Sequence, residues 1–303
     1  MSVIVVGTVA LDCIETPFGR ADEMLGGSGT HFASAASYFA PVHLVGVVGE
    51  DFPREALHYL KERGVNLDHV VTAPGRSFRW EGRYHYDMNT RDTLKTELGV
   101  LAGFTPKISP SCREGEHLFL GNIHPAVQMQ VLEQVRARTV SLDTMNLWIE
   151  TERKGLEQVM ARVDLMVLNE EEARQLSGEY SLVKAARTIN RLGPRILVIK
   201  RGEYGALLFY KGEIFSAPGL PLEAVKDPTG AGDSFAGGLI GYLDRSGPLD
   251  FETLKKGVIM GSVMASFNVE DFGPNRLKKL GRDEIRGRIE EFRRLAHFEP
   301  LEV

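Results

Sequence analysis

The sequence is poor in cysteine, with only Cys13 and Cys112 among its 303 residues. Two isolated thiols form neither a disulfide framework nor a metal-binding pattern. The chain also lacks any apolar run of about 20 residues, the length needed to cross a bilayer. Its first residues, MSVIVVG, carry no basic segment, so we expect no signal peptide. These absences together predict a cytoplasmic globular protein.

Neither sign of charge dominates, because 36 Lys and Arg face 41 Asp and Glu, a formal net charge of -5. Nucleic acids and anionic membranes attract net positive charge, so this balance argues against both as main partners. The length suggests roughly two domains, although single α/β domains also reach this size. Glycine, in contrast, is plentiful: there are 32 residues, several of them clustered.

Short apolar runs alternate with helical patterns along most of the chain. The runs cover residues 3–6, 43–48, 117–120, 140–142, 165–168 and 196–199. The helical patterns cover residues 54–63, 127–138, 151–162, 181–192, 231–243, 251–267 and 282–295. Strands that are apolar throughout and alternate with helices predict βαβ units and a parallel sheet covered on both faces.

Two stretches, about 11–24 and 76–100, interrupt this alternation. In the second, Phe78, Trp80, Gly82, Tyr84 and Tyr86 alternate with Arg79, Glu81, Arg83 and His85. A period of two predicts strands with one covered and one polar face. We expect a small β-sheet lid over one edge of the main sheet, the alternative being an ordinary edge hairpin of that sheet.

The most informative segment is DPTGAGDSF, residues 227–235. Gly230, Ala231 and Gly232 form a small, permissive turn that leads into a helix, and such a turn lets backbone N–H groups approach an anion. Asp233 follows in the first helical turn, where the helix dipole stabilises any carboxylate. Asp233 could also accept a hydroxyl proton while the N–H groups neutralise a transferred phosphoryl group.

This segment closely resembles the C-terminal signature of the PfkB carbohydrate kinases, in the ribokinase-like superfamily. The resemblance extends along nearly the whole chain. It implies a three-layer αβα sandwich with a mostly parallel central sheet and a small β-sheet lid, forming one kinase domain over residues 1–303. It also implies that Asp233 is the catalytic base and that Gly230, Ala231 and Gly232 form the anion hole.

Two N-terminal segments resemble the substrate-binding part of the same family. Asp12 matches the aspartate that binds substrate hydroxyls, and Gly26 and Gly27 match paired glycines that let those hydroxyls approach the backbone. His31 stands where Asn is common, which makes it a candidate substrate contact. Ser28 replaces a lysine found in ribokinases, and this departure argues against ribose as the substrate.

Other landmarks resemble the nucleotide-binding part of the family. Asn169 and Glu172 match a motif associated with Mg²⁺ and its water shell, although Asn169 is also a good helix N-cap. Lys200, Gly202 and Gly205 resemble the loop that contacts the ATP phosphates, although a tight hairpin would also explain the glycines.

Three weaker matches complete the expected site. Asp143 and Asn146 resemble a turn near the phosphate path, Asn268 stands where relatives bring an Asn near adenine, and Asp227 matches a monovalent-cation ligand. The cofactors implied are therefore ATP and Mg²⁺, with K⁺ as a candidate.

We expect an ATP-dependent kinase that phosphorylates a hydroxyl of a small sugar or cyclitol. A nucleoside is the alternative acceptor, because the aromatic lid residues could stack a base. A catalytically silent nucleotide- or sugar-binding regulator is the alternative of another class, against which Asp233, Asn169 and Glu172 argue. Relatives dimerise through the lid, so a homodimer of this kind is a further expectation. The sequence does not assign roles to Arg79, Arg83 and Arg91.

Overall fold

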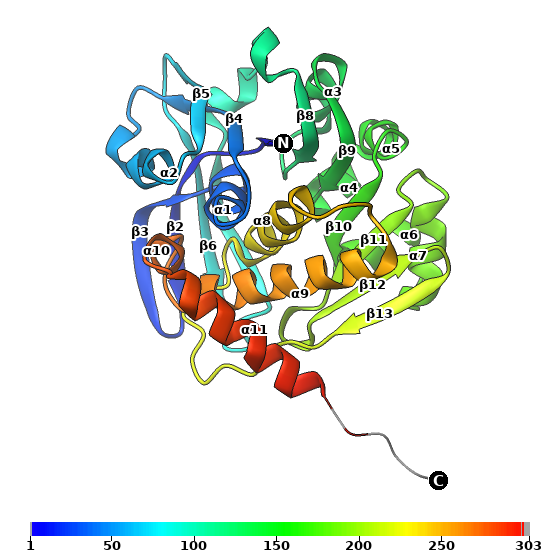
Figure 1. Ribbon diagram of the computed structural model, residues 1–303. Helices are drawn as coiled ribbons and strands as arrows, with labels where there is room; N and C mark the ends of the chain where they lie inside the picture. Colours follow the sequence, from blue (N-terminus) through cyan, green and yellow to red (C-terminus); the bar gives the residue numbers. More distant parts are fainter. Residues whose placement is uncertain (1, 298, 300–303) are drawn as a thin grey trace.

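A computed structural model of the chain describes residues 2–297 and 299 and contains two β-sheets, one nine-stranded and one four-stranded (Figure 1). The larger sheet has the spatial order β13 (Glu213–Ala217), β12 (Ala206–Tyr210), β11 (Ile196–Lys200), β10 (Leu165–Asn169), β9 (Arg136–Asp143), β8 (Glu114–Leu120), β1 (Val3–Val6), β4 (Val42–Gly49) and β5 (Asn66–Ala73). From β11 to β5 neighbouring strands are parallel, whereas β12 and β13 are antiparallel.

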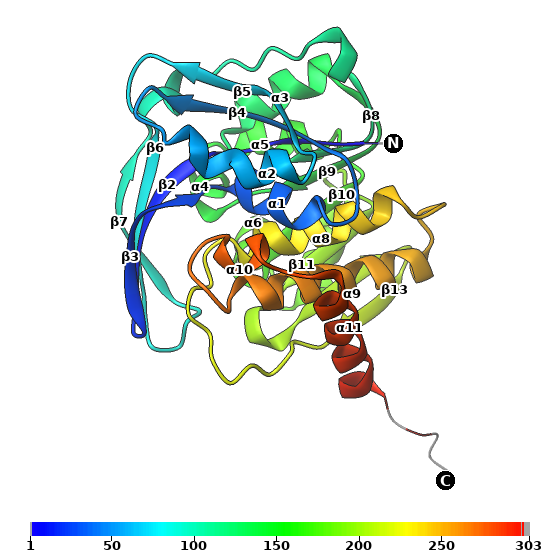
Figure 2. The same cartoon turned by 60° about the vertical axis from the view of Figure 1, so that its left-hand side comes forward.

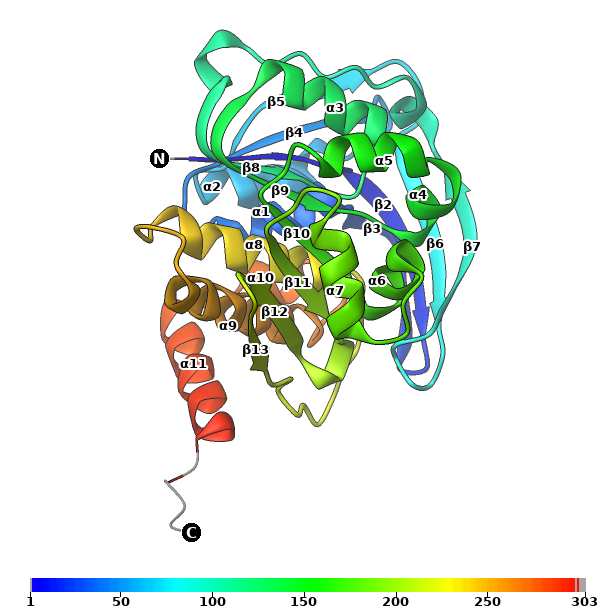
Figure 3. The same ribbon diagram turned by 90° about the vertical axis from the view of Figure 1, so that its right-hand side faces the viewer.

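Helices cover both faces of the larger sheet (Figure 3), which is why its central strands are apolar throughout. In β1, Val3 and Val5 pack into one layer and Ile4 and Val6 into the other, because successive side chains of a strand point to opposite faces. The first layer contains α1 (Ser28–Ala36), η1 (Arg54–Leu57), α2 (His58–Glu62), α8 (Ala231–Asp244) and α9 (Phe251–Asn268), with α10 (Asn275–Lys278) and α11 (Arg282–Ala296) packed outside them. The second contains η2 (Gly99–Gly103), η3 (Pro110–Cys112), α3 (Pro125–Gln134), α4 (Asn146–Thr151), α5 (Arg153–Met160), α6 (Glu170–Ser177) and α7 (Leu182–Asn190).

The order of the strands reverses at β1. The chain starts in the centre of the sheet, adds β4 and β5 on one side, and then returns to add β8, β9, β10 and β11 on the other. In open α/β sheets, ligands bind outside the carboxyl ends of the strands at such a reversal point. The segments that follow β1 and β8 therefore mark the expected position of the site.

The four-stranded sheet lies beside this carboxyl edge (Figure 2), with the order β3 (Gly19–Gly26), β2 (Ala10–Thr16), β6 (Phe78–Tyr84) and β7 (Arg91–Glu97). β2 and β6 are parallel, and their register places Asp12 opposite Trp80, so both side chains are on the same face. This sheet lies in the segments where the sequence predicts the lid. Its boundaries as a lid inserted into a single domain stay a prediction.

Two predicted helices differ from the structure. The pattern at 127–138 contains α3, which ends at Gln134, and the start of β9, because the extended backbone of Val135 lets Arg136 pair with β8. The pattern at 151–162 is interrupted at Glu152, whose φ of -128° and ψ of 31° separate α4 from α5. In both places the sequence pattern continues as if one helix ran through. The backbone nevertheless leaves the helical conformation there, because strand pairing or packing requires it.

The alternation predicted for the second sheet holds only as far as Tyr84. Tyr84 is buried, whereas Tyr86 lies in the turn beyond β6 and is 84% exposed, so its predicted place on the covered face is wrong. The strands β5, β12 and β13 were not among the predicted runs. In the part of the chain that the structure describes, no helix is both long and apolar enough to span a bilayer.

Phe32 provides a test of how α1 is held on the sheet. Its ring stacks on Phe119 of β8 with centroids 4.3 Å apart, and both side chains are fully buried. Replacing Phe32 by Ala should lower the free energy of unfolding by about 3–5 kcal/mol, because the helix and sheet cannot collapse to fill the space. Urea titration measures this loss. Tyr180→Ala is the control, because Tyr180 is 87% exposed, and an equally small loss in both variants would contradict the packing described.

Candidate active site

The anion-binding turn lies at the N-terminus of α8. Gly230 is the N-cap and has a left-handed backbone, with φ 73° and ψ 1°. A Cβ atom at Gly230 would lie 2.3 Å from the ring of His31, so this position requires glycine for space as well as for conformation. The first turn of the 14-residue helix that follows presents N–H groups that have no partners within the helix. The turn therefore has the geometry of an anion site.

Asp233 is the acidic residue of this first turn. Burial raises its pKa to about 7, and the neighbouring Asp143 adds to the increase, while the charges of Lys200 and Arg91 oppose it. A carboxylate with a pKa near neutral can accept a proton at physiological pH more effectively than an ordinary aspartate. The role of Asp233 as general base stays a prediction.

Lys200, at the end of β11, supplies a positive charge to the same place, and its side chain is 16% exposed. Its Nζ lies 3.2 Å from Oδ2 of Asp143, and a Cβ atom on Gly232 would lie 2.8 Å from that nitrogen. Burial lowers the pKa of Lys200, but Asp143, Glu172 and Asp233 outweigh this effect and raise it above its usual value. The lysine therefore stays charged directly beside the anion-binding turn.

Asn169 and Glu172 form both halves of a capping box at the start of α6. The backbone N–H of Asn169 donates to Glu172 Oε2 at 2.8 Å, and that of Glu172 donates to Asn169 Oδ1 at 2.8 Å. The capping box alone therefore explains why Asn and Glu occur at these two positions. Burial nevertheless raises the pKa of Glu172, whose carboxylate lies near Lys200 and Asp143. A role of Asn169 and Glu172 in binding Mg²⁺ stays a prediction.

Asp12, in β2, forms the other end of the site. Its side chain is 4% exposed, its Oδ1 has no hydrogen-bond partner among the described residues, and a Cβ atom on Gly26 would lie 1.9 Å from its Oδ2. Gly27 has φ 95° and marks the start of α1. Burial raises the pKa of Asp12 to about 8; Asp227 and Asp233 raise it further, while the Gly27 N–H lowers it. An unpartnered buried carboxyl oxygen of this kind is suited to accept a hydrogen bond from a ligand hydroxyl.

His31 and Asn268 lie next to the glycine turn formed by residues 230–232. His31 Nδ1 lies 3.1 Å from Asn268 Oδ1, which also accepts from the Ser234 hydroxyl, and Asn268 Nδ2 donates to the carbonyl of Thr229 at 2.8 Å. Both side chains are 1% exposed or less, and burial lowers the pKa of His31 to about 4. These hydrogen bonds hold the turn in place. The expected contacts of His31 with the substrate and of Asn268 with adenine stay predictions.

Asp227 connects two turns through its carboxylate. Oδ1 accepts from the N–H of Thr229 at 2.8 Å and Oδ2 accepts from the N–H of Gly273 at 2.9 Å. Asp227 thereby connects the segment 268–273 to the start of the glycine turn at residues 230–232. A role for Asp227 in binding K⁺ stays a prediction.

Gly202 and Gly205, the two glycines of the predicted phosphate loop, are required for different reasons. A Cβ atom on Gly205 would lie 2.1 Å from the carbonyl oxygen of Ala217, so the β12–β13 hairpin accounts for that glycine. Gly202 has φ 56°, and a Cβ atom there would lie 2.6 Å from Asn89 Oδ1. The turn between β6 and β7 therefore reaches the main sheet at Gly202.

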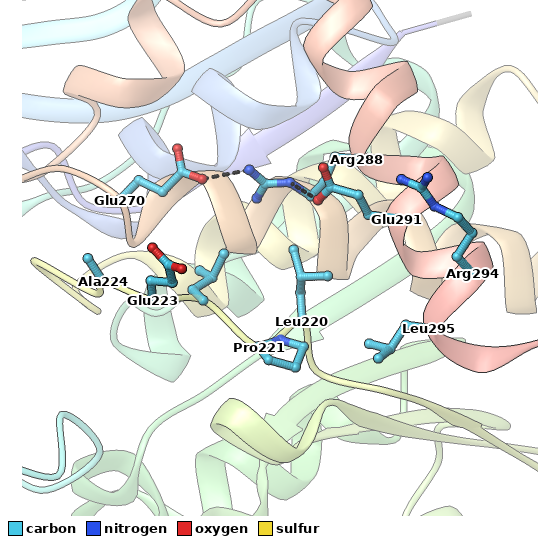
Figure 4. A pocket seen from close by; sticks show the side chains of 10 residues that line it. Leu220, Pro221, Glu223, Ala224, Glu270, Arg288, Glu291, Arg294 and Leu295 are labelled. Carbon is cyan, nitrogen blue, oxygen red and sulfur yellow. Dashed lines mark hydrogen bonds and ion pairs between the residues drawn. The ribbon is translucent and has the colours of Figure 1, made fainter.

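A cavity of about 950 Å³ lies between the segment 220–224 and α11 (Figure 4). The segment leads directly into Asp227, and the opposite rim includes Glu270, which follows Val269. The carbonyl of Val269 accepts from the N–H groups of Lys226 and Asp227. Sequence reasoning missed this cavity, because its two walls are far apart in the chain.

Asp233, a glycine turn at a helix N-terminus and a neighbouring lysine lie together at the carboxyl edge of an α/β sheet, an arrangement suited to phosphoryl transfer. The chain belongs to the pfkB family of carbohydrate kinases, whose pattern matches residues 2–279. It is an ATP-dependent phosphotransferase of the kind that acts on sugars or nucleosides.

Individual relatives span both kinds of acceptor. A cytidine kinase from Thermococcus kodakarensis is 31% identical over 256 residues, which cover 82% of this chain and 91% of the relative. A 2-dehydro-3-deoxygluconokinase from Thermoproteus tenax is 27% identical, with 79% and 80% covered. Among solved structures, the nucleoside kinase of Methanocaldococcus jannaschii matches with a TM-score of 0.75 at 19% identity, covering 96% of this chain and 98% of that one. Arabidopsis thaliana ribokinase with ribose and ATP matches with a TM-score of 0.77 at 20% identity, covering 95% and 98%.

The buried charge of Asp12 predicts a pH-dependent cost to stability. Its pKa is about 8 in the folded chain against an ordinary value of 3.8, so folding becomes less favourable as the pH rises between these values. Asp12→Asn removes the charge and keeps an oxygen acceptor. We expect the melting temperature of this variant, relative to the unmodified protein, to increase more at pH 9 than at pH 5. Asp68→Asn, at an exposed aspartate, is the control, and an equal difference for Asp12→Asn at both pH values would contradict the assignment.

Proposed function

We propose that the protein transfers the γ-phosphoryl group of ATP to a hydroxyl of a nucleoside, with Asp233 as the general base. The observation that carries this proposal is the position of Asp233, a carboxylate with a raised pKa in the first turn of α8, beside the left-handed glycine turn whose Gly232 faces Lys200. The acceptor hydroxyl would lie between Asp12 and Asp233. Asp12 would orient the hydroxyl, and Asp233 would take its proton as the new P–O bond forms.

The negative charge of the transferred group is balanced by two parts of the chain. The N–H groups at Gly230, Ala231 and Gly232 would donate to the phosphoryl oxygens, and Lys200 would bring its ammonium group to the same oxygens. Because both are already fixed by the helix and by Asp143, they need little reorganisation during the reaction.

Glu172 and Asp143 are the carboxylates that would hold Mg²⁺, with Asn169 beside them. No three His, Cys, Asp or Glu side chains of the described chain converge to form a complete metal site by themselves. This donor set fits an ion held by few carboxylates together with water and the ATP phosphates, which is the usual environment of Mg²⁺ in kinases. When bound, Mg²⁺ withdraws negative charge from the phosphate oxygens.

The cavity beside α11 offers room for the adenosine part of ATP. Its loop wall, 220–224, shortly precedes Asp227 in the chain, and we infer that a nucleotide there directs its phosphates toward Gly230 and Lys200. The contact of Asn268 with adenine stays a separate prediction; its side chain hydrogen-bonds with His31, Ser234 and Thr229.

Two observations support a nucleoside as acceptor. Trp80 lies on the same face of the second sheet as Asp12, the benzo end of its indole lies over Gly82, and its side chain is only partly buried. An aromatic surface of this kind can stack a base. The cytidine kinase named above also matches 91% of its own length. A small sugar acid is the second candidate, because the deoxygluconokinase relative is also matched over most of its length.

Asp233→Asn should lower kcat by about 10²- to 10⁴-fold, the usual effect of losing a general base. The affinity for ATP should change little, since the turn and Lys200 remain. A coupled assay that detects ADP measures the first quantity, and isothermal titration calorimetry with ATP measures the second. Asp283→Asn, at an exposed aspartate on α11, is the control. Turnover close to normal in Asp233→Asn would exclude the proposed mechanism.

The acceptor is tested by offering Mg-ATP with cytidine, other nucleosides, 2-keto-3-deoxygluconate, hexoses and inositols. We expect kcat/KM to be highest for a nucleoside, and Trp80→Ala to raise the KM for that nucleoside because the stacking surface is lost. Turnover of the sugar acid alone would support the second candidate. Silence across the whole panel would support a binding protein without catalysis.

A further inference from the structure

A smaller cavity, of about 170 Å³, lies at the other end of the main sheet, between its edge strand β5 and the segment 104–107. Val45, His69 and Val71 form the floor of this cavity, and residues 104–107 form its cover. Val45 pairs with His69 across β4 and β5, and Val71 follows two residues later in β5. The three floor residues therefore lie on one face of the sheet.

The cover is held in place by hydrogen bonds on both sides. From α3, Gln134 Nε2 donates to the carbonyl of Pro106 at 2.9 Å, and Gln134 Oε1 accepts from the N–H of Ile108 at 3.0 Å. From β5, His69 Nε2 accepts from the N–H of Ser109 at 3.0 Å. Phe104 is buried in the core of the second layer. The space beneath the cover is therefore a formed cavity with fixed walls.

The hydrogen bond from Ser109 decides the tautomer of His69. A backbone N–H group can only donate, so Nε2 of the ring must be the acceptor, and the neutral ring carries its hydrogen on Nδ1. His69 is 8% exposed, and no described residue accepts a hydrogen bond from its Nδ1. Leaving a buried donor without a partner is unfavourable. A ligand with an acceptor oxygen would satisfy this N–H group.

The other walls indicate the rest of the ligand. Val45, Val71, Phe104 and Pro106 present apolar surface, whereas Lys107 is exposed and adds a positive charge at the rim. None of the lining residues that the structure describes is acidic. An apolar cavity of about 150 Å³ can hold benzene, so a body of about six carbon atoms fits in this space. A buried N–H donor and a rim ammonium group together favour a carboxylate on that body.

The two sides of the cavity are also the two stems of the β6–β7 hairpin. β5 leads through residues 74–77 into β6, and β7 leads through η2 into the cover. The stems are joined where the N–H of Val100 donates to the carbonyl of Arg76 at 2.9 Å. Ala73 and Val100, one from each stem, pack against the same apolar cluster that contains Phe104. A ligand in the cavity would thus contact both stems at the base of the second sheet.

We propose that this cavity binds a small monocarboxylate with an apolar body and that the ligand joins the two stems of the β6–β7 hairpin. The Nδ1–H group of His69 donates to one carboxylate oxygen, and the ammonium group of Lys107 approaches the other from the rim. The apolar body packs between Val71 and Phe104. This inference is independent of the proposed function, because none of these residues is assigned to the active site.

Benzoate is a suitable probe, and benzyl alcohol is its uncharged counterpart. Isothermal titration calorimetry with the full chain should show one site for benzoate with a Kd of about 1 mM or lower. Benzyl alcohol should bind at least about tenfold more weakly, because it lacks the charge-assisted contacts. Equal affinity for both compounds would refute the recognition of a carboxylate.

Two variants at exposed positions test the walls without removing a buried group. Lys107→Glu should weaken benzoate binding by at least about tenfold, because the rim charge is reversed. Val71→Phe should abolish binding by filling the cavity. Lys184→Glu and Val183→Phe, at exposed positions of α7, are the matched controls and should bind benzoate as the unmodified protein does. Thermal melting should show all four variants folded.

Two further measurements locate the ligand. The imidazole ¹⁵N spectrum should show hydrogen on Nδ1 of His69, and benzoate should shift that resonance. Amide hydrogen exchange of residues 73–77 and 98–104 should slow when benzoate is bound, while exchange in α7 should not change.

Four results would overturn the inference. The first is no binding of benzoate up to about 10 mM. The second is normal binding in both Lys107→Glu and Val71→Phe, which would place the ligand elsewhere. The third is hydrogen on Nε2 of His69 instead of Nδ1. The fourth is binding without slower exchange in either stem, which would show that the ligand does not join them.

Discussion

Lys200 lies where β11, the end of β9 and the first turn of α8 meet, and its contact with Asp143 sets the electrostatics of the whole site. Burying several carboxylates near one another is costly, because each loses solvation and repels the others. The lysine offsets this cost for Asp143, Glu172 and Asp233 at once. It also leaves a fixed positive charge beside Gly232, where a phosphoryl group would add negative charge of its own.

The acceptor end of the site lacks such a cation. Asp12 is buried, carries an unpartnered oxygen, and lies in the field of Asp227 and Asp233. The fold therefore retains an unfavourable carboxylate that a ligand hydroxyl can satisfy. The two ends therefore favour different ligand groups. Anionic groups are favoured at Lys200, and neutral hydroxyl groups are favoured at Asp12.

The second sheet connects these two ends. β2 carries Asp12, and the hairpin of β6 and β7 reaches the catalytic turn through Tyr84 and the main sheet through Asn89. A cover that contacts both ends excludes water from the transferred group, and exclusion of water strengthens each electrostatic interaction inside. Its outward face bears ion pairs such as Arg83–Glu15. Dimerisation through this sheet stays a prediction.

The sequence alone determined the parallel sheet, the segments of the second sheet and the glycine turn at residues 230–232. These features follow from local periodicity and from the DPTGAGDSF motif, which involve only residues that are neighbours in the chain. It also predicted Lys200, although not the charge balance around it. The tertiary structure decided which distant segments meet. Asn268 donates to the carbonyl of Thr229 just before the glycine turn, Arg83 pairs with Glu15 across the second sheet, and a cavity forms between 220–224 and α11. These outcomes depend on register and on contacts between distant segments, and a local pattern holds no information about either.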